Sequence, residues 1–379
     1  MPPAPPSGVS GPERFPWPML VTAWRRKHSL DASAVMGAVV LLHAAALALL
    51  VGVVVPLHLR LGEATVGVGL GFTAYTYGLR HALDADHIAA IDNTTRKLRG
   101  DGRRSASVGF WFAMGHSTMV VVLAALVAGG ARLAASLTNS RSAIRSILGL
   151  LSTTVSGVFL YVIAAINLAA LAGLARTFRQ LRADGVKPAD ADPGVLVGGF
   201  VTRALGRLNR TVTRPWQMYL VGLLFGLGFD TATEISLLVL AGTGAAERLP
   251  WFAIMALPLA FAAGMSLLDS LDGLFMSIAY DWAFLHPVRK IYYNLSITGL
   301  SVAVALLIGT IELVGVLHDQ AGWHNGVADW VSRIRMNDVG LLIAAMFVAT
   351  WAVAVTTWRL LRLDERSRPG AVYEPDAGE

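Results

Sequence analysis

Long apolar runs dominate this sequence, and eight of them are long enough to cross a lipid bilayer as helices. A helix needs about 20 residues to cross a hydrocarbon layer about 30 Å thick. Only 15% of the residues are charged, whereas soluble domains carry about 25%. The sequence therefore predicts an all-α, polytopic integral membrane protein with eight transmembrane helices. They are expected at 34–56, 66–91, 108–130, 147–175, 217–242, 250–278, 291–317 and 338–359.

The distribution of Lys and Arg predicts the orientation of these helices. Twenty-three of the 31 basic residues fall in tails and loops on one side of the expected membrane, against seven on the other. Cytoplasmic loops carry the excess of Lys and Arg, so both termini are expected in the cytoplasm and the chain in the cytoplasmic membrane. The expected organisation is a disordered basic tail at 1–33, a transmembrane domain at 34–361 with a cytoplasmic loop at 176–216, and a tail at 362–379.

The chain contains no cysteine. This excludes disulfides, thiolate metal sites and thiol catalysis, so metal ligands would have to be nitrogen or oxygen atoms. The net charge of +6 would suggest a nucleic-acid partner in a soluble protein. Membrane topology explains it better here, because the basic residues gather in particular loops. The expected partner is the lipid bilayer, and no nucleic acid is expected.

Residues 80–88 place an unusual density of charge inside the expected 66–91 helix. They read Arg-His-Ala-Leu-Asp-Ala-Asp-His-Ile. One charged side chain at the bilayer centre costs about 2.5–3.5 kcal/mol or more, so such residues pair, face a cavity or carry an ion. The stretch is therefore a candidate functional site.

The spacing within this stretch favours a metal site. On a continuous helix His81, Asp84 and His87 share one face, while Asp86 projects away unless the helix is locally unwound. Imidazole and carboxylate ligands suit divalent transition metals such as Ni²⁺, Co²⁺ and Zn²⁺. The alternative without a metal is a structural ion-pair network in which Arg80 is the counter-charge. The density of residues that can bind metals favours a metal site over this network.

Two further expected helices carry polar groups at membrane depth. His116 lies in the Gly-His-Ser-Thr stretch, at a depth similar to that of His87 when both are counted from the nearest basic loop. Asp230 and Glu234 lie in the middle of the fifth expected helix, with no basic partner nearby in sequence. An excess of acids within a membrane needs protons or metal cations to be tolerated.

The sixth and first expected helices add weaker candidates. Asp269 and Asp272 lie in the sixth, and Asp269 is 21 residues from Arg248, about 31 Å along a helix. Asp269 is therefore expected near the cytoplasmic end. His43 is the one strongly polar residue of the first helix, so a buried, hydrogen-bonded histidine is a better interpretation than a metal ligand.

These motifs resemble the nickel/cobalt transporter (NiCoT) family over nearly the whole chain. The second-helix signature Arg-His-Ala-hydrophobic-Asp-Ala-Asp-His-Ile appears as Arg80–Ile88, and the third-helix Gly-His-Ser-Thr as Gly115–Thr118. The fifth-helix Leu-Gly-Phe-Asp-Thr-Ala-Thr-Glu appears intact as Leu227–Glu234. The sixth-helix Gly-Met-x3-Asp-Thr-x-Asp appears as Gly264–Asp272, with Ser270 in place of the threonine, so a hydroxyl is retained.

The resemblance implies an eight-helix permease that takes up Ni²⁺ and Co²⁺ as transported substrates, with no separate cofactor. It also implies that His81, Asp84, Asp86 and His87 are central to ion recognition, and it connects His43 with ion preference. We expect His81, Asp84 and His87 to form the main coordination shell. No ATPase partner is expected, because no Gly-rich nucleotide motif stands out in the chain.

The remaining candidates receive supporting roles. His116 is expected as a further ligand or as a residue that orients one. Asp86, Asp230 and Glu234 are expected to complete the ion path or to relay protons. The exit to the cytoplasm is assigned to the two acids of the sixth helix, Asp269 and Asp272.

Two alternatives to uptake stay open. The first is efflux of nickel or cobalt by the same fold, because ligand chemistry does not encode direction. The extended histidine-rich loop associated with such exporters is absent, which favours uptake. The second is an intramembrane metalloenzyme, but the chain has no His-Glu-x-x-His spacing and only nine histidines, so an enzyme is not expected.

Overall fold

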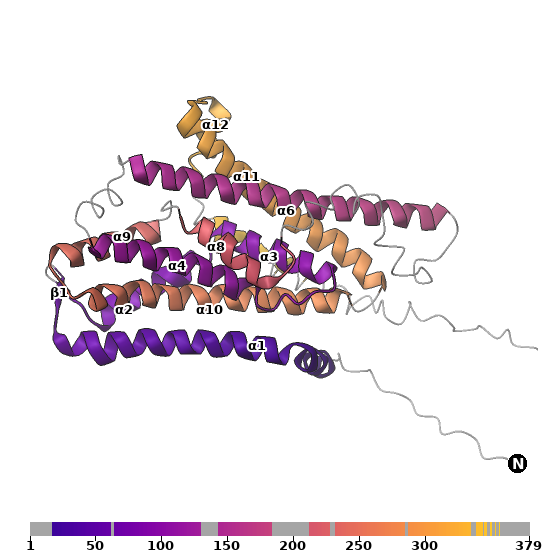
Figure 1. Cartoon of the computed structure of the whole chain (residues 1–379). Helices are drawn as coiled ribbons and strands as arrows, with labels where there is room; N and C mark the ends of the chain where they lie inside the picture. Colours follow the sequence, from indigo (N-terminus) through magenta and orange to yellow (C-terminus); the bar gives the residue numbers. More distant parts are fainter. Residues whose placement is uncertain are drawn as a thin grey trace, which may run out of the picture.

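A computed structural model of the chain describes residues 17–61, 64–129, 143–183, 212–227, 232–284, 287–334 and parts of 339–356 (Figure 1). Nearly all of these residues are helical. Within them the strands are the two-residue β1 (Arg60–Leu61) and β2 (Ala64–Thr65), which form an antiparallel hairpin. The described part is therefore all-α, as predicted. Its long helices are α1 (Trp17–Leu47), α4 (Val108–Gly129), α6 (Ala143–Ala183), α10 (Trp251–Phe284) and α11 (Pro287–Ala321).

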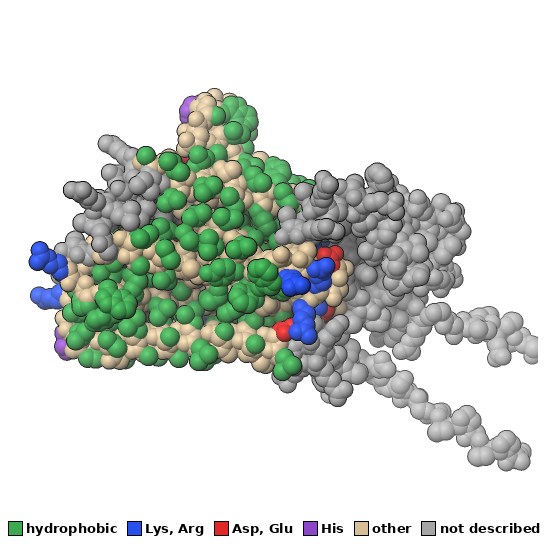
Figure 2. Space-filling model, in the orientation of Figure 1, with side chains coloured by type: hydrophobic (Ala, Val, Ile, Leu, Met, Phe, Trp, Pro, Cys, Tyr) green, Lys and Arg blue, Asp and Glu red, His purple; other side chains and the backbone are tan. Residues whose placement is uncertain are grey.

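Five of the described helices are long and apolar enough to cross a membrane. Figure 2 shows hydrophobic side chains along the flank of the helix bundle, with Lys, Arg, Asp and Glu gathered toward its ends. Phe72, Leu151 and Leu307 are among the large apolar side chains left exposed. A surface of this kind suits lipid and not water. The five spans are Leu30–Leu57, Val108–Ala128, Ser146–Ala169, Trp251–Asp281 and Gly299–Ala321.

The helix expected over 66–91 is broken, which is the local unwinding that the position of Asp86 left open, and a single continuous helix is not formed. α2 (Val68–His81) ends in a tight turn, in which the backbone N–H groups of Leu83 and Asp84 donate to oxygens three residues earlier, at 3.1 and 2.9 Å. Asp84 is extended, with φ −66° and ψ 145°, and α3 (Ala85–Gly100) starts directly after it. Side chains on both sides of the break can then face the same space.

The helix expected over 217–242 is also divided. The short 3-10 helix η4 (Pro215–Gln217) leads into α8 (Met218–Phe225), which ends in a turn at Gly226. α9 (Ala232–Ala246) begins beyond four residues that lie outside the described part. Two interrupted helices therefore replace two of the expected continuous spans.

The last expected helix, over 338–359, is described only in parts. One of these parts packs directly against the break between α2 and α3. A Cβ atom added to Gly340 would lie closer than 3.0 Å to the carbonyl oxygen of Leu83, a separation that real Cβ atoms essentially never show. Glycine is therefore needed for this close approach.

Glycines also allow the central helices to pack backbone against backbone. A Cβ atom on Gly78 of α2 would lie closer than 3.0 Å to the carbonyl oxygen of Phe261 on α10. The same holds for Gly115 of α4 against Tyr219 of α8, and for Gly222 of α8 against the backbone of α4. Small residues of this kind are what lets membrane helices approach closely. These contacts hold α2 against α10 and α8 against α4.

Helix α3 carries basic residues into the protein interior. The sequence predicts a cytoplasmic loop at Arg96, Lys97 and Arg99, but all three lie on α3 with at most 8% of their surface exposed. The Lys97 ammonium donates to the carbonyl oxygen of Val212 at 2.8 Å. Arg99 forms an ion pair with Asp281 of α10. Burial is tolerable for these two charges because each has such a partner.

Two other elements extend beyond their expected limits. α1 begins at Trp17, within the segment expected as a disordered tail, and continues through η1 (Ala48–Val54) and η2 (Val55–Leu57). α6 continues to Ala183, into the segment expected as a loop. Most of the expected 176–216 loop lies outside the described residues.

Candidate metal centre

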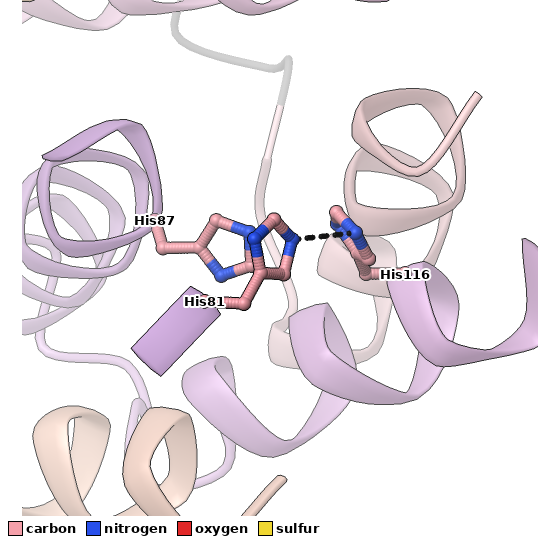
Figure 3. A group of neighbouring side chains, drawn as sticks. All are labelled: His81, His87 and His116. Atoms are coloured by element: carbon pink, nitrogen blue, oxygen red, sulfur yellow. Dashed lines mark hydrogen bonds between the residues drawn. The ribbon is translucent and has the colours of Figure 1, made fainter. Parts of the chain in front are cut away.

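Three buried histidines from three helices converge on one point (Figure 3). His81 is the last residue of α2, His87 lies in the first turn of α3, and His116 lies on α4. Their ring centroids are 4.6, 4.7 and 4.9 Å apart. One ring nitrogen of each lies within 4.8 Å of those of the other two. The break between α2 and α3 allows this, because it brings two histidines of neighbouring segments to the same place beside α4.

A carboxylate from a fourth helix completes a triangle of possible ligand atoms. Glu234, in the first turn of α9, places Oε1 2.7 Å from His116 Nε2 and 3.5 Å from His81 Nε2. The two histidine Nε2 atoms are 3.0 Å apart. Ligands about 2.1 Å from one metal ion are separated by about 3.0 Å at right angles and about 3.4 Å at the tetrahedral angle. The triangle therefore has the dimensions of a site for one ion.

Two of the histidines have a carboxylate beside their Nδ1 atom, which leaves Nε2 as the possible metal ligand. His81 Nδ1 lies 2.8 Å from Asp84 Oδ2, and His87 Nδ1 lies 3.3 Å from Asp269 Oδ2. Histidines that ligate metals usually donate their other ring N–H to such a carboxylate, which fixes the tautomer and the ring orientation. In the described part of the chain the buried Nε2 of His87 has no hydrogen-bond partner, as a ligand atom would without its ion.

Aromatic rings enclose the cluster. Phe112 of α4 meets His87 edge to face, with centroids 4.8 Å apart, and Phe261 of α10 lies 5.6 Å from His81. Phe112 and Phe261 are fully buried. Their bulk limits the rotamers of both imidazoles and keeps the surroundings dry, which strengthens electrostatic attraction between an ion and its ligands. Sequence reasoning missed both aromatic residues, because only the packing of α4 and α10 shows that they face the histidines.

The structure brings together six of the predicted site residues: His81, Asp84, His87, His116, Glu234 and Asp269. The expected location of Asp269 near the cytoplasmic end is wrong, because its carboxylate contacts His87 at the cluster. α10 has 34 residues, about 51 Å of helix, so Asp269 lies near its middle.

Of the four remaining predicted residues, three lie apart from this group and one lies outside the described residues. His43 Nδ1–H donates to Val39 O at 2.8 Å and its Nε2 lies 3.4 Å from Tyr75 Oη, so it is a satisfied helix histidine. Asp86 is only partly buried in the first turn of α3, and Asp272 lies one turn beyond Asp269 on α10. Asp230 lies outside the described residues.

Arg80 makes no direct ion pair with the cluster, although its charge acts on Asp84 from a distance. Its side chain is exposed, and no ion pair within the described ranges joins it to a carboxylate. Among the described residues, the structural alternative to a metal site, an ion-pair network built on this arginine, is therefore not seen as direct contacts.

A second polar network runs from α3 toward α6 and α10, and it was also missed by sequence reasoning. Asn93 of α3 accepts a hydrogen bond from Asn167 of α6 at 2.8 Å. Asp92 accepts one from the Tyr280 hydroxyl of α10. These side chains satisfy one another inside the protein, and they lock α3, the helix that carries His87, to its neighbours. The spacing of Asn and Tyr in the sequence carries no signal for such pairs.

We predict that Asp84→Asn weakens nickel binding by about 10–100-fold, the usual cost of losing a residue that orients a metal-ligating histidine. The amide oxygen can still accept from His81 Nδ1–H, but it lacks the negative charge with which the carboxylate orients the ring and raises its basicity. Equilibrium binding of ⁶³Ni²⁺ to the purified protein measures the effect. Asp101→Asn, at an exposed position after α3, is the matched control and should bind as wild type. Equal affinity in both variants would remove Asp84 from the site.

The chain is a multi-pass membrane protein. Its helices enclose imidazoles and carboxylates from distant parts of the chain, which together form a candidate cation-binding site. A family model described as high-affinity nickel-transport protein matches residues 67–357. The chain belongs to this nickel/cobalt transporter family, whose members are transport proteins and not enzymes, and it is a multi-pass protein of the cell membrane.

Several curated relatives carry similar names. The nickel transporter NicT of Mycobacterium tuberculosis is 52% identical over 315 residues, which cover 83% of this chain and 85% of that protein. A high-affinity nickel transport protein of Cupriavidus necator is 40% identical, with 86% and 93% covered. The cobalt transport protein NhlF of Rhodococcus rhodochrous is 40% identical, with 88% and 94% covered. No solved structure gives a significant match.

Proposed function

We propose that this protein is a secondary-type permease that imports Ni²⁺, and also Co²⁺, across the cytoplasmic membrane through the buried cluster formed by His81, His87, His116 and Glu234. The observation that carries the proposal is the triangle of His81 Nε2, His116 Nε2 and Glu234 Oε1, with edges of 3.0, 2.7 and 3.5 Å. In the proposed topology eight transmembrane helices, two of them interrupted, leave both termini in the cytoplasm.

The proposed coordination differs from the one expected from the sequence. His81 Nε2, His116 Nε2 and Glu234 provide three ligands, and the unpartnered Nε2 of His87 provides the fourth. Asp84 takes an orienting role in place of a ligand role, because its carboxylate already holds His81 Nδ1. The acid expected at the cytoplasmic exit, Asp269, orients His87 in the same way.

The charge of the cluster supports a divalent cation as its occupant. Carboxylates buried away from water are costly unless a cation compensates them. Glu234, Asp84 and Asp269 are each at most 3% exposed. A dehydrated divalent ion among them would supply the missing charge. The absence of cysteine fits nickel and cobalt better than Cu(I), which thiolates select.

The route to the cytoplasm follows α10 in this proposal. Below Asp269, the same helix presents Asp272, Ser277 and Asp281 at intervals of three to five residues, and α3 lies beside this face. The carboxylate of Asp272 has a buried oxygen without a hydrogen-bond partner in the described residues. Asp86 and Asp230 are proposed to complete the ion path or to relay protons.

The direction of transport is tested by measuring cell growth and nickel accumulation at limiting and at toxic nickel concentrations. A nickel-dependent host that expresses the protein should accumulate more ⁶³Ni²⁺ than the empty-vector control, and should grow better when nickel is limiting. It should become more sensitive when nickel is in toxic excess. An exporter gives the opposite pattern, with lower accumulation and protection at toxic concentrations, and that result would replace import by efflux.

A further inference from the structure

A second group of metal-type side chains lies at the end of α11, remote in sequence from the buried cluster. His318 is in the last turn of α11, His324 follows in the connecting turn, and Asp329 is in the short helix α12 (Gly326–Val331). One donor atom of each lies within 4.8 Å of the other two. We refer to His318, His324 and Asp329 as the α11–α12 cluster.

The α11–α12 cluster has nearly the same dimensions as the buried triangle. His318 Nε2 lies 3.1 Å from His324 Nδ1 and 3.1 Å from Asp329 Oδ1. The third edge, between His324 Nδ1 and Asp329 Oδ1, is 3.6 Å. These separations again match ligands about 2.1 Å from one ion. Two imidazole nitrogens and a carboxylate oxygen are a donor set that Ni²⁺ and Co²⁺ accept.

The surroundings of the α11–α12 cluster fix its geometry. Asp319 Oδ1 lies 2.8 Å from His318 Nδ1, which is the carboxylate–histidine arrangement that directs the other ring nitrogen toward a metal. Gly322, with a φ of +65°, ends α11 and turns the chain back. Asn325 then caps α12 by accepting from the backbone N–H groups of Val327 and Ala328, at 3.1 and 2.7 Å.

The α11–α12 cluster is open to solvent, unlike the buried one. The side chains of His318, His324 and Asp329 are 20%, 64% and 41% exposed. Figure 1 shows α12 projecting from the bundle, and Figure 2 shows histidine on the surface of this projection. Three protein ligands with open neighbouring space would hold an ion that keeps part of its water shell.

The location of the α11–α12 cluster follows from the length of α11. The helix starts at Pro287, on the side proposed to face the cytoplasm, and its 35 residues extend about 52 Å. In the proposed topology this far end is directed toward the outer side, and Figure 1 shows α11 running obliquely so that α12 leaves the flank of the bundle. We propose that the α11–α12 cluster is a second binding site for Ni²⁺ or Co²⁺ on the outer face, where the partly hydrated ion binds before it reaches the buried cluster. This inference rests on the proposed import function.

Equilibrium binding of ⁶³Ni²⁺ to the purified full-length protein tests the second site. Wild type should bind two equivalents. His324→Ala, or Asp329→Asn as a second variant, should lose one of them through a drop in affinity of at least about 100-fold, since even an orienting residue contributes about 10–100-fold. His58→Asn, which removes an exposed imidazole outside the cluster, is the matched control. Unchanged stoichiometry and affinity in both cluster variants would overturn the proposal.

A labelling experiment tests the side of the membrane. Because the chain has no cysteine, Val327→Cys, at a position 73% exposed, introduces a single thiol beside the cluster. A membrane-impermeant maleimide should label it in intact cells, and added Ni²⁺ should slow the labelling. Labelling only after lysis would overturn the outer location.

The two proposals fail in distinguishable ways. If Glu234→Gln abolishes nickel accumulation while His324→Ala binds like wild type, the second site is wrong and the import function stands. If His324→Ala loses one equivalent while Glu234→Gln accumulates nickel normally, the second site stands and the proposed transport route is wrong.

Discussion

Glu234→Gln should reduce nickel accumulation to the level of cells without the protein. The substitution keeps the size of the side chain but removes the negative charge that lies 2.7 Å from His116 Nε2. Loss of one partner from a buried charged site costs about 3–5 kcal/mol, which corresponds to at least about 100-fold in ion affinity. Initial rates of ⁶³Ni²⁺ uptake at limiting nickel measure the loss directly.

The control for this variant is Glu247→Gln. Glu247 follows α9 directly and is exposed, so the same chemical change there should leave uptake within twofold of wild type. Membrane levels of both variants, measured by immunoblot, separate a transport defect from poor insertion. Uptake near the wild-type rate in Glu234→Gln at normal membrane levels would exclude the carboxylate from the ion path.

Gly115→Ala should destabilise the protein and impair transport, although it adds a single methyl group. The new Cβ would lie closer than 3.0 Å to the carbonyl oxygen of Tyr219 on α8, so α4 and α8 must move apart. Overpacking of this kind typically costs about 1–3 kcal/mol and occasionally more. Because His116 is the next residue, the displacement also shifts one corner of the buried triangle. The melting temperature of the purified protein and the uptake rate should both fall.

Gly149→Ala is the matched control for this helix contact. Gly149 lies on α6, and nothing stands within 4 Å of a Cβ atom added there. In that open position alanine favours the helix over glycine by about 1 kcal/mol, so the melting temperature should hold or rise. Similar melting temperatures for the two variants would show that the α4–α8 contact tolerates a side chain.

The convergence of His81, His87 and His116 could be predicted from the sequence. Residues that can bind metals are concentrated in two apolar segments, and His87 and His116 lie at similar depths in the expected membrane. The position of Asp269 could not, because its depth was counted along the helix from Arg248 as if the membrane began there. The same assumption fails at Arg96, which is buried on α3. A charged residue marks the membrane boundary only where it faces water, and one sequence does not show which residues do.

The breaks in the second and fifth expected helices were hidden for a different reason. The helical spacing of His81, Asp84 and His87 continues through Leu83 and the apolar pattern continues through Gly226, so periodicity alone predicts uninterrupted helices. Backbone hydrogen bonding and the extended conformation of Asp84 decide where α2 ends. The break also decides the role of Asp84, because spacing shows that a carboxylate is close to His81 but not which ring nitrogen it reaches.

The contact between Gly340 and Leu83 has a consequence for biogenesis. The segment that covers the break between α2 and α3 is made about 255 residues after the break itself, which at about 5–20 residues per second is a delay of roughly 13 to 50 s. During that interval the newly inserted polypeptide has its histidine-bearing turn uncovered on one side. Assembly of the ion centre must therefore wait for late translation, and nascent chains that stall earlier leave the turn accessible to quality-control proteases.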